Sequence, residues 1–171
     1  MPLKNDYVNY STHGICRVEE IRFMQFDRSS KGRGYYILRP VHPDNIRIFV
    51  PMGNPHLAER MRPVLSPVEI DQTILSVKNQ TLQWIDDCKQ RAAMFRKILL
   101  QRDERELLLL VSCLYLKSRE GAKALSASDV QILKAAEEII EQEFSFSLKI
   151  STQQIGNYIR EKLGLVKSIG A

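Results

Sequence analysis

One tryptophan and two arginines could together bind nucleic acid in this 171-residue chain. Apolar residues at three- and four-residue spacing predict a helix over residues 82–101. Its buried seam would comprise Ile85, Cys88, Ala92, Phe95 and Leu99. At ~100° per residue, Trp84, Arg91 and Arg102 would follow a second line at the margin of that face. The ring could stack on or wedge between bases while the guanidinium groups bind phosphates.

The same residues also allow a purely structural interpretation. A lone tryptophan often fills a gap between helices, and spacing alone does not separate that role for Trp84 from a nucleic-acid contact. The basic run from Lys89 to Arg105 favours the nucleic-acid interpretation. The candidate DNA-binding residues are therefore Trp84, Lys89, Arg91 and Arg102.

Other chemistry is poorly supported by the residue types present. His13 and Cys16 are three residues apart, but no second pair completes a metal site. Asp86 and Asp87 suit the positive end of a helix dipole better than an acid–base pair. No Walker loop, GxGxxG element or nucleophile elbow is found. We therefore predict no enzyme, no metal, no cofactor and no small-molecule substrate.

Alternating apolar residues predict strands in the first 65 residues. The expected strands cover residues 6–10, 15–24, 35–39 and 46–50, with a short fifth strand near 61–64. A polar, glycine-containing connection over residues 27–34 is typical of a hairpin. Strands this short cannot form a large sandwich, and a closed SH3- or Tudor-like barrel would protect their edges.

Three- to four-residue spacing predicts helices from residue 66 onward. Ser66 to Glu69 form a capping box, with proline at the first helical position. The five expected helices cover residues 67–77, 82–101, 104–118, 127–148 and 152–163. The predicted fold is therefore α+β, with a barrel domain over residues 1–65 and an all-helical domain over residues 66–171. No strand follows the helices, which argues against the usual α/β enzyme architectures.

The composition, 44% apolar and 26% charged, is typical of a soluble globular protein. No apolar run approaches the ~18 residues of a membrane span, and the first residues carry no apolar signal core. We expect a cytoplasmic protein without membrane association. The scattered Cys16, Cys88 and Cys113 are expected to be reduced thiols used as small apolar residues.

The net charge of +5 is unevenly distributed. Residues 1–68 contain 10 Lys or Arg and 6 Asp or Glu, whereas residues 69–171 contain 15 and 14. This basic excess permits contact with nucleic acid or an acidic protein surface without establishing either.

Three sequence blocks occur in a common order. The first covers residues 6–18, the second residues 35–40 and 48–51, and the third residues 102–116 followed by 125–129. Together they resemble the CarD/CdnL/TRCF family of bacterial RNA polymerase-binding regulators. The resemblance implies a Tudor-like domain that binds the polymerase β subunit and a helical domain that contacts promoter DNA. It also implies that a tryptophan, here Trp84, wedges into the minor groove at the upstream edge of the transcription bubble and stabilises the open complex.

The chain departs from the family pattern at several positions. An ungapped alignment places the family's wedge at Cys88, one helical turn after Trp84. Val130 and Gln131 replace a pair that is often basic in the family. On the barrel, Met24 and Phe49 occupy positions that are basic polymerase contacts in some relatives. Two residues away on the same strand faces are arginines, so the candidate polymerase-binding residues are Arg22, Met24, Arg47 and Phe49.

Two functions of different classes remain open. The first is a transcription regulator that binds RNA polymerase and promoter DNA. The second is a protein–protein adaptor, with a partner-binding barrel, a helical oligomerisation domain and no DNA role. The near-neutral charge of residues 69–171 favours the adaptor, whereas Trp84 and the basic run after it favour the regulator.

Overall fold

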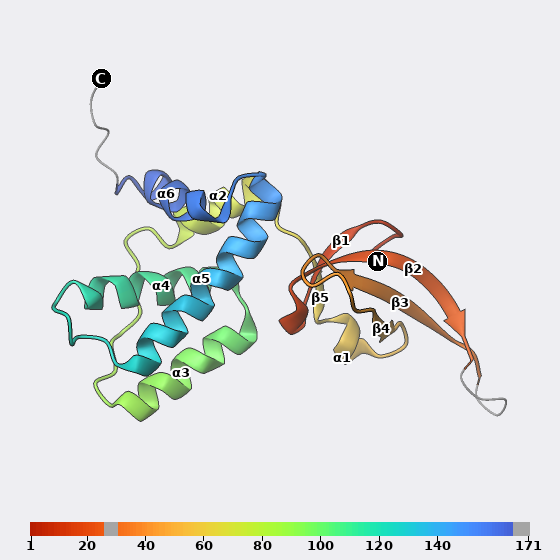
Figure 1. Ribbon diagram of the computed structural model, residues 1–171, viewed down its shortest axis with the longest axis horizontal. Coiled ribbons are helices and arrows are strands. Elements are labelled where there is room, and N and C mark those ends of the chain that lie inside the picture. Colours follow the sequence, from red (N-terminus) through yellow and green to blue (C-terminus); the bar gives the residue numbers. More distant parts are fainter. Residues whose placement is uncertain (26–30, 166–171) are drawn as a thin grey trace, which may run out of the picture. The chain divides into compact units, whose positions relative to one another are not determined.

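The chain folds as an antiparallel sheet followed by helices, and this computed structural model describes residues 1–25 and 31–165 (Figure 1). It divides into two compact units, Met1–Val64 and Leu65–Ala171. The first contains five strands and the short helix α1 (Pro55–Ala58), and the second contains five α-helices among its described residues. The predicted α+β class and the strand-then-helix order are confirmed.

The strands of the first unit form one sheet in the order β4-β3-β2-β1-β5, with all neighbours antiparallel. Their bounds are β1 (Tyr7–Tyr10), β2 (Ile15–Met24), β3 (Arg33–Pro40), β4 (Ile48–Pro51) and β5 (Met61–Pro63). The prediction of a closed barrel is not confirmed, because among the described residues β4 and β5 each pair only with their inner neighbour. These edge strands are only four and three residues long, and α1 packs beside β4.

The core of the first unit lies on one face of the sheet, as strand alternation requires. Its buried members are Val8, Tyr10, Cys16, Val18, Tyr36, Leu38 and Val50. A β-bulge between Val18 and Glu20 adds a residue to β2 and shifts its alternation. Beyond the bulge, Glu20 pairs with Ile37 and Arg22 pairs with Tyr35, on the face away from this core.

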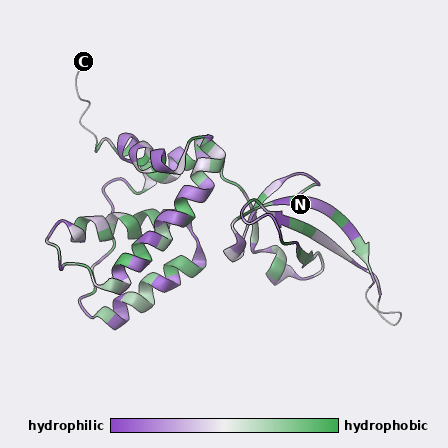
Figure 2. Ribbon diagram, in the orientation of Figure 1, coloured by the Kyte–Doolittle hydropathy of each residue, from purple (hydrophilic) through white to green (hydrophobic). Residues whose placement is uncertain are grey.

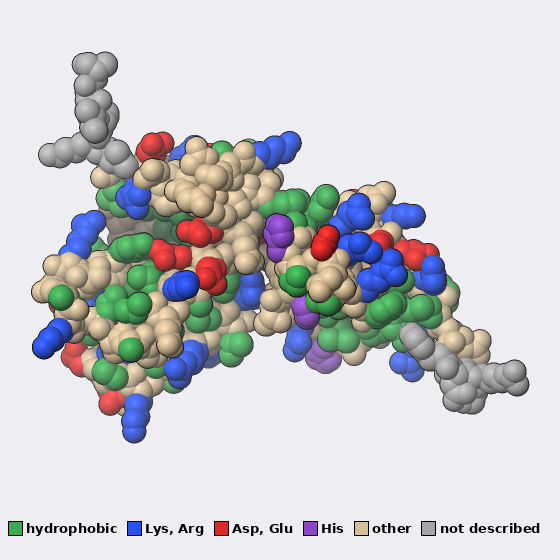
Figure 3. Space-filling model, in the orientation of Figure 1, with side chains coloured by type: hydrophobic (Ala, Val, Ile, Leu, Met, Phe, Trp, Pro, Cys, Tyr) green, Lys and Arg blue, Asp and Glu red, His purple; other side chains and the backbone are tan. Residues whose placement is uncertain are grey.

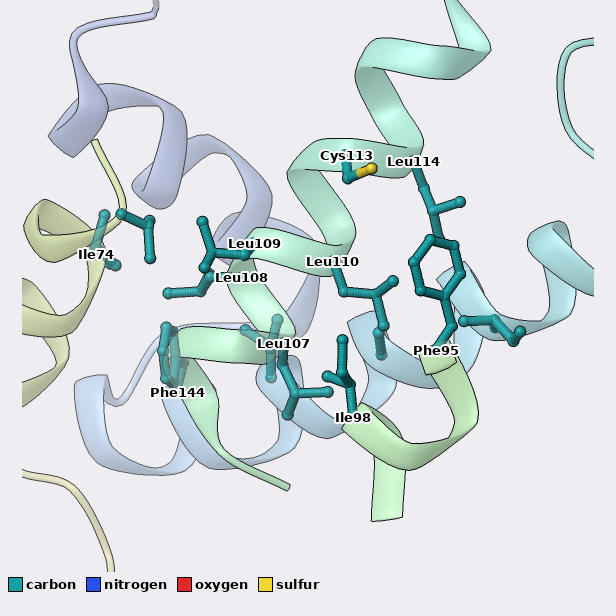
Figure 4. Packing of buried hydrophobic residues seen from close by; sticks show 14 of the residues in the cluster. Ile74, Phe95, Ile98, Leu107, Leu108, Leu109, Leu110, Cys113, Leu114 and Phe144 are labelled. Carbon is teal, nitrogen blue, oxygen red and sulfur yellow. The ribbon is translucent and has the colours of Figure 1, made fainter. Parts of the chain in front are cut away.

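The described residues of the second unit form five helices, along which apolar and polar residues are interspersed (Figure 2). Their bounds are α2 (Pro67–Ser76), α3 (Cys88–Gln101), α4 (Glu104–Ser118), α5 (Ala127–Leu148) and α6 (Thr152–Leu163). The apolar run of α4 lies inside the bundle, where it meets Phe95 of α3 and Phe144 of α5 (Figure 4). Among the described residues, no helix combines the length and apolar character that a membrane crossing requires.

Local capping sets the helix boundaries. Ser66 Oγ accepts the Glu69 N–H and the Glu69 carboxylate accepts the Ser66 N–H, so α2 begins at the predicted capping box. Ser126 and Asp129 form the same reciprocal pair at the start of α5. Four of the five helices match the predicted ranges to within one residue at each end.

Helix α3 is the exception, and the prediction that it begins at residue 82 is wrong. The Asp87 carboxylate accepts the Gln90 N–H at 2.8 Å and caps the helix. The carbonyl oxygens of Ile85 and Asp86 accept hydrogen bonds from Arg91 at 2.7 and 3.2 Å. In a continuing helix those carbonyls would bond to the backbone four residues later. Residues 81–87 are therefore non-helical. The predicted alignment of Trp84 with Arg91 and Arg102 along one line of a helix is not formed.

Candidate interfaces for nucleic acid and protein

Trp84 lies in this non-helical segment, at the edge of the helical core. Its ring is half-buried, and its centroid lies 6.4 Å from that of the buried Phe95 ring, in an edge-on arrangement. Two cations approach the indole: the guanidinium carbon of Arg91 is 4.2 Å from the ring centroid and the Lys117 ammonium is 5.0 Å away. Contacts of this type stabilise a ring by about 0.5–2 kcal/mol each. Trp84 is thus held in place while part of its surface remains in solvent.

Arg91 is buried, with 3% of its surface exposed. Its Nε and Nη2 donate to the two carboxylate oxygens of Asp129 at 3.0 and 2.8 Å. The remaining N–H groups reach the carbonyls of Ile85 and Asp86 and the sulfur of Cys88. Hydrogen bonding to Asp129 raises the pKa of Arg91 above its ordinary value. Because this guanidinium is engaged with protein acceptors, the geometry predicted for a phosphate contact at Arg91 is not found.

The other two predicted DNA contacts lie at opposite ends of α3. Lys89 is exposed in the first turn. Arg102 is a partly buried C-cap in the left-handed conformation, with a φ of 52°. At 1.5 Å per residue the two positions are about 20 Å apart along the axis. The structure therefore brings together Trp84 and Arg91, and it leaves Lys89 and Arg102 apart.

Two residues near the Trp84–Arg91 contact, Asp129 and Lys117, are not among the predicted site residues. Nothing local in the sequence indicates that Asp129 is the partner of Arg91, which lies 38 positions earlier. Burial alone would raise the pKa of Asp129, but hydrogen bonds from Arg91 and Ser126 lower it below its ordinary value. Lys117, in the last turn of α4, is partly exposed and also pairs with Glu120.

A second candidate surface is the outer face of β2, β3 and β4. Backbone pairing aligns Glu20, Ile37 and Phe49 in one rung, and the next rung contains Arg22 and Tyr35. Alternation along β2 places Met24 on the same face as Arg22, one rung further along. The predicted polymerase-binding residues of β2 and β4 thus lie on one side of the sheet.

Charged side chains frame Phe49 on this face. Arg47, which immediately precedes β4, donates to Glu19 Oε2 at 2.7 Å, and Arg39 lies 2.9 Å from Glu19 Oε1. The hydrogen bond from Arg47 is the main reason why the pKa of Glu19 is lowered. Phe49 itself is 48% exposed. An exposed aromatic ring within a basic frame is typical of a protein-binding surface.

Charge is distributed differently over the two units. In the view of Figure 3, basic side chains gather beside hydrophobic ones over the sheet unit, whereas on the helical unit they are scattered among acidic ones. Within residues 1–25 and 31–165, no group of three or more His, Cys, Asp or Glu side chains is arranged to hold a metal ion.

Part of the chain matches a known protein family. Residues 4–65 match the family model described as the CarD-like/TRCF RID domain. These residues coincide with the sheet unit and include its outer face. A search of curated proteins finds no match for the chain.

Proposed function

We propose that this CarD-like family protein, whose RID domain spans residues 4–65, regulates transcription by binding the RNA polymerase β subunit and promoter DNA. The RID family is a family of protein-interaction domains that points to RNA polymerase and to transcription, and it is not a known enzyme family. The sheet unit binds the β subunit. The helical unit contacts DNA at the upstream edge of the transcription bubble and stabilises the open complex.

The match at residues 4–65 carries the polymerase half of the proposal, and the outer face of the sheet supports it. Phe49 offers exposed apolar area on that face, and Arg22 and Arg47 offer positive charge on the same face. Strand β4 is also an edge of the sheet, so an extended partner segment could add to it through backbone hydrogen bonds.

Trp84 supports the DNA half of the proposal. Part of its ring is exposed, and its contacts with Phe95 and Arg91 hold the ring in place before DNA arrives. A side chain that binds only melted DNA lowers the free energy of the open complex relative to the closed one. A difference of ~1.4 kcal/mol changes that equilibrium tenfold.

The two halves can be tested separately with the full chain. Binding to an immobilised β-subunit lobe tests the first, and the lifetime of a promoter open complex tests the second. Binding to the lobe without any change in open-complex lifetime would leave a polymerase-binding protein whose helical unit has another role.

The alternative function is a protein–protein adaptor whose helical unit forms oligomers. It is favoured by large apolar side chains that are at least half exposed on the described part of that unit, namely Val68, Leu75, Leu100, Leu116, Val130 and Leu165. The mass of the purified protein in solution discriminates between the two functions. A stable oligomer that ignores forked promoter DNA would support the adaptor.

A further inference from the structure

A buried ion pair lies directly beside the proposed DNA contact. Arg91 and Asp129 have side chains that are 4% and 1% exposed, and they meet through two parallel N–H···O hydrogen bonds. Replacing such a pair by apolar residues often leaves stability unchanged or increased, so its presence is not explained by stability alone. A pair of this kind can instead fix one particular arrangement of the segments that it joins.

Arg91 joins three segments of the helical unit. Its own backbone belongs to α3, its Nη1 holds the carbonyls of Ile85 and Asp86, and its partner Asp129 lies in the first turn of α5. Asp129 is itself fixed, because its Oδ2 accepts from both the backbone N–H and the hydroxyl of Ser126. The planar guanidinium therefore has little freedom to move.

The same guanidinium lies over the indole of Trp84, 4.2 Å from the ring centroid. It thus fixes the ring directly and also fixes the backbone one and two residues after it. A lysine could supply the charge but not the two-pronged contact with Asp129 or the flat surface against the ring. We infer that the Arg91–Asp129 pair positions Trp84, so that Arg91 acts on DNA through the tryptophan and not by binding phosphate itself.

The position of Trp84 can be measured without DNA, because it is the single tryptophan in the chain. Arg91→Lys should shift its emission to longer wavelength and make it easier to quench with acrylamide. Loss of the ring contact should raise the undocked population about five-fold, which corresponds to ~1 kcal/mol. Circular dichroism of the same samples gives the folded fraction to which the quenching is normalised.

A second variant guards against simple unfolding. Arg91→Met with Asp129→Asn leaves no unpaired buried charge, and asparagine can still accept the Ser126 N–H. It should also release the ring. Lys97→Met, which removes an exposed cation from the same helix, should leave the emission and the quenching unchanged. The inference is overturned if either Arg91 variant is folded and keeps the wild-type emission and quenching.

The functional consequence of this inference rests on the proposed function, and open-complex lifetime tests it separately. If the ring is released and the lifetime per folded molecule falls towards that of Trp84→Ala, positioning and DNA contact are both supported. If the ring is released and the lifetime is unchanged, Arg91 still positions Trp84, and the proposed DNA contact is what fails.

Discussion

Phe49 is the residue on which partner binding by the sheet should depend most. Nearly half of its surface faces solvent, whereas Ile37, its pairing partner on the same face, is already buried. Burying such a ring in a protein interface releases more free energy than closing a surface ion pair like that of Arg47 and Glu19.

Phe49→Ser should weaken binding to the RNA polymerase β lobe about ten-fold or more, because a central aromatic contact contributes ~1.4 kcal/mol or more. Calorimetry or surface binding with the full chain measures the change. Phe23→Ser is the matched control, since Phe23 is 79% exposed and alternates onto the opposite face of β2. Equal losses in the two variants would show that the outer face is not the binding surface.

Arg47→Glu should also reduce this binding while leaving the sheet folded. The Arg47 side chain is exposed, and its partner Glu19 is partly exposed, so reversing the charge costs little stability. The reversed charge places a second carboxylate beside Glu19 and removes one cation from the frame around Phe49. Binding measured at low and high salt should differ less in the variant than in the wild type. An unchanged affinity at low salt would contradict an electrostatic role for this arginine.

At the scale of elements, local signals predicted most boundaries. The capping boxes at Ser66 and Ser126 are formed by residues three apart, so the sequence displays them directly. The start of α3 has a local cap at Asp87, but it also depends on Arg91, whose guanidinium binds two backbone carbonyls, and on Asp129 from another helix. Periodicity cannot reveal that competition, because it arises only when α3 and α5 are packed together. Barrel closure was also beyond local patterns, since it depends on where two short edge strands lie.

The ion pair between Arg91 of α3 and Asp129 of α5 should be lost at low pH. The folded-state pKa of Asp129 is below its ordinary value, so its contribution to stability is complete above the unfolded pKa of ~3.9 and is lost as pH falls through the folded value. The helical unit should therefore lose stability progressively below about pH 4. Thermal unfolding followed by circular dichroism from pH 7 to about pH 2 measures the loss.

Asp129→Asn should remove the part of this pH dependence that belongs to the pair. At neutral pH it leaves the buried charge of Arg91 without its partner, which costs about 3–5 kcal/mol. Parallel acid profiles of wild type and variant would contradict the assignment, because the titrating group would then lie elsewhere.

At the scale of the whole molecule, the charge is too small for tight, autonomous DNA binding. The residues from 69 onward carry nearly equal numbers of basic and acidic side chains, and the predicted basic contact Arg91 is internally paired. Free protein should bind duplex DNA only non-specifically, with a Kd of roughly 10⁻⁴–10⁻⁶ M. A salt titration gives the number of phosphate contacts from its slope.

Lys89→Gln should lower that slope by about one if the exposed lysine contacts a phosphate. Lys4→Gln, a matched exposed change in the sheet unit, should leave the slope unaltered. Tight and sequence-specific binding without polymerase would instead indicate a self-sufficient repressor.

The most direct test of the account is the lifetime of a promoter open complex formed by RNA polymerase with wild-type protein or with Trp84→Ala. The variant should bind polymerase normally and should lose less stability than the ~3–5 kcal/mol of a fully buried aromatic, because the ring is only half-buried. Loss of an aromatic contact worth ~1–3 kcal/mol should shorten the lifetime about five-fold or more. A lifetime per folded molecule equal to that of the wild type would show that Trp84 only packs against the helical core. The helical unit would then not stabilise the open complex through Trp84.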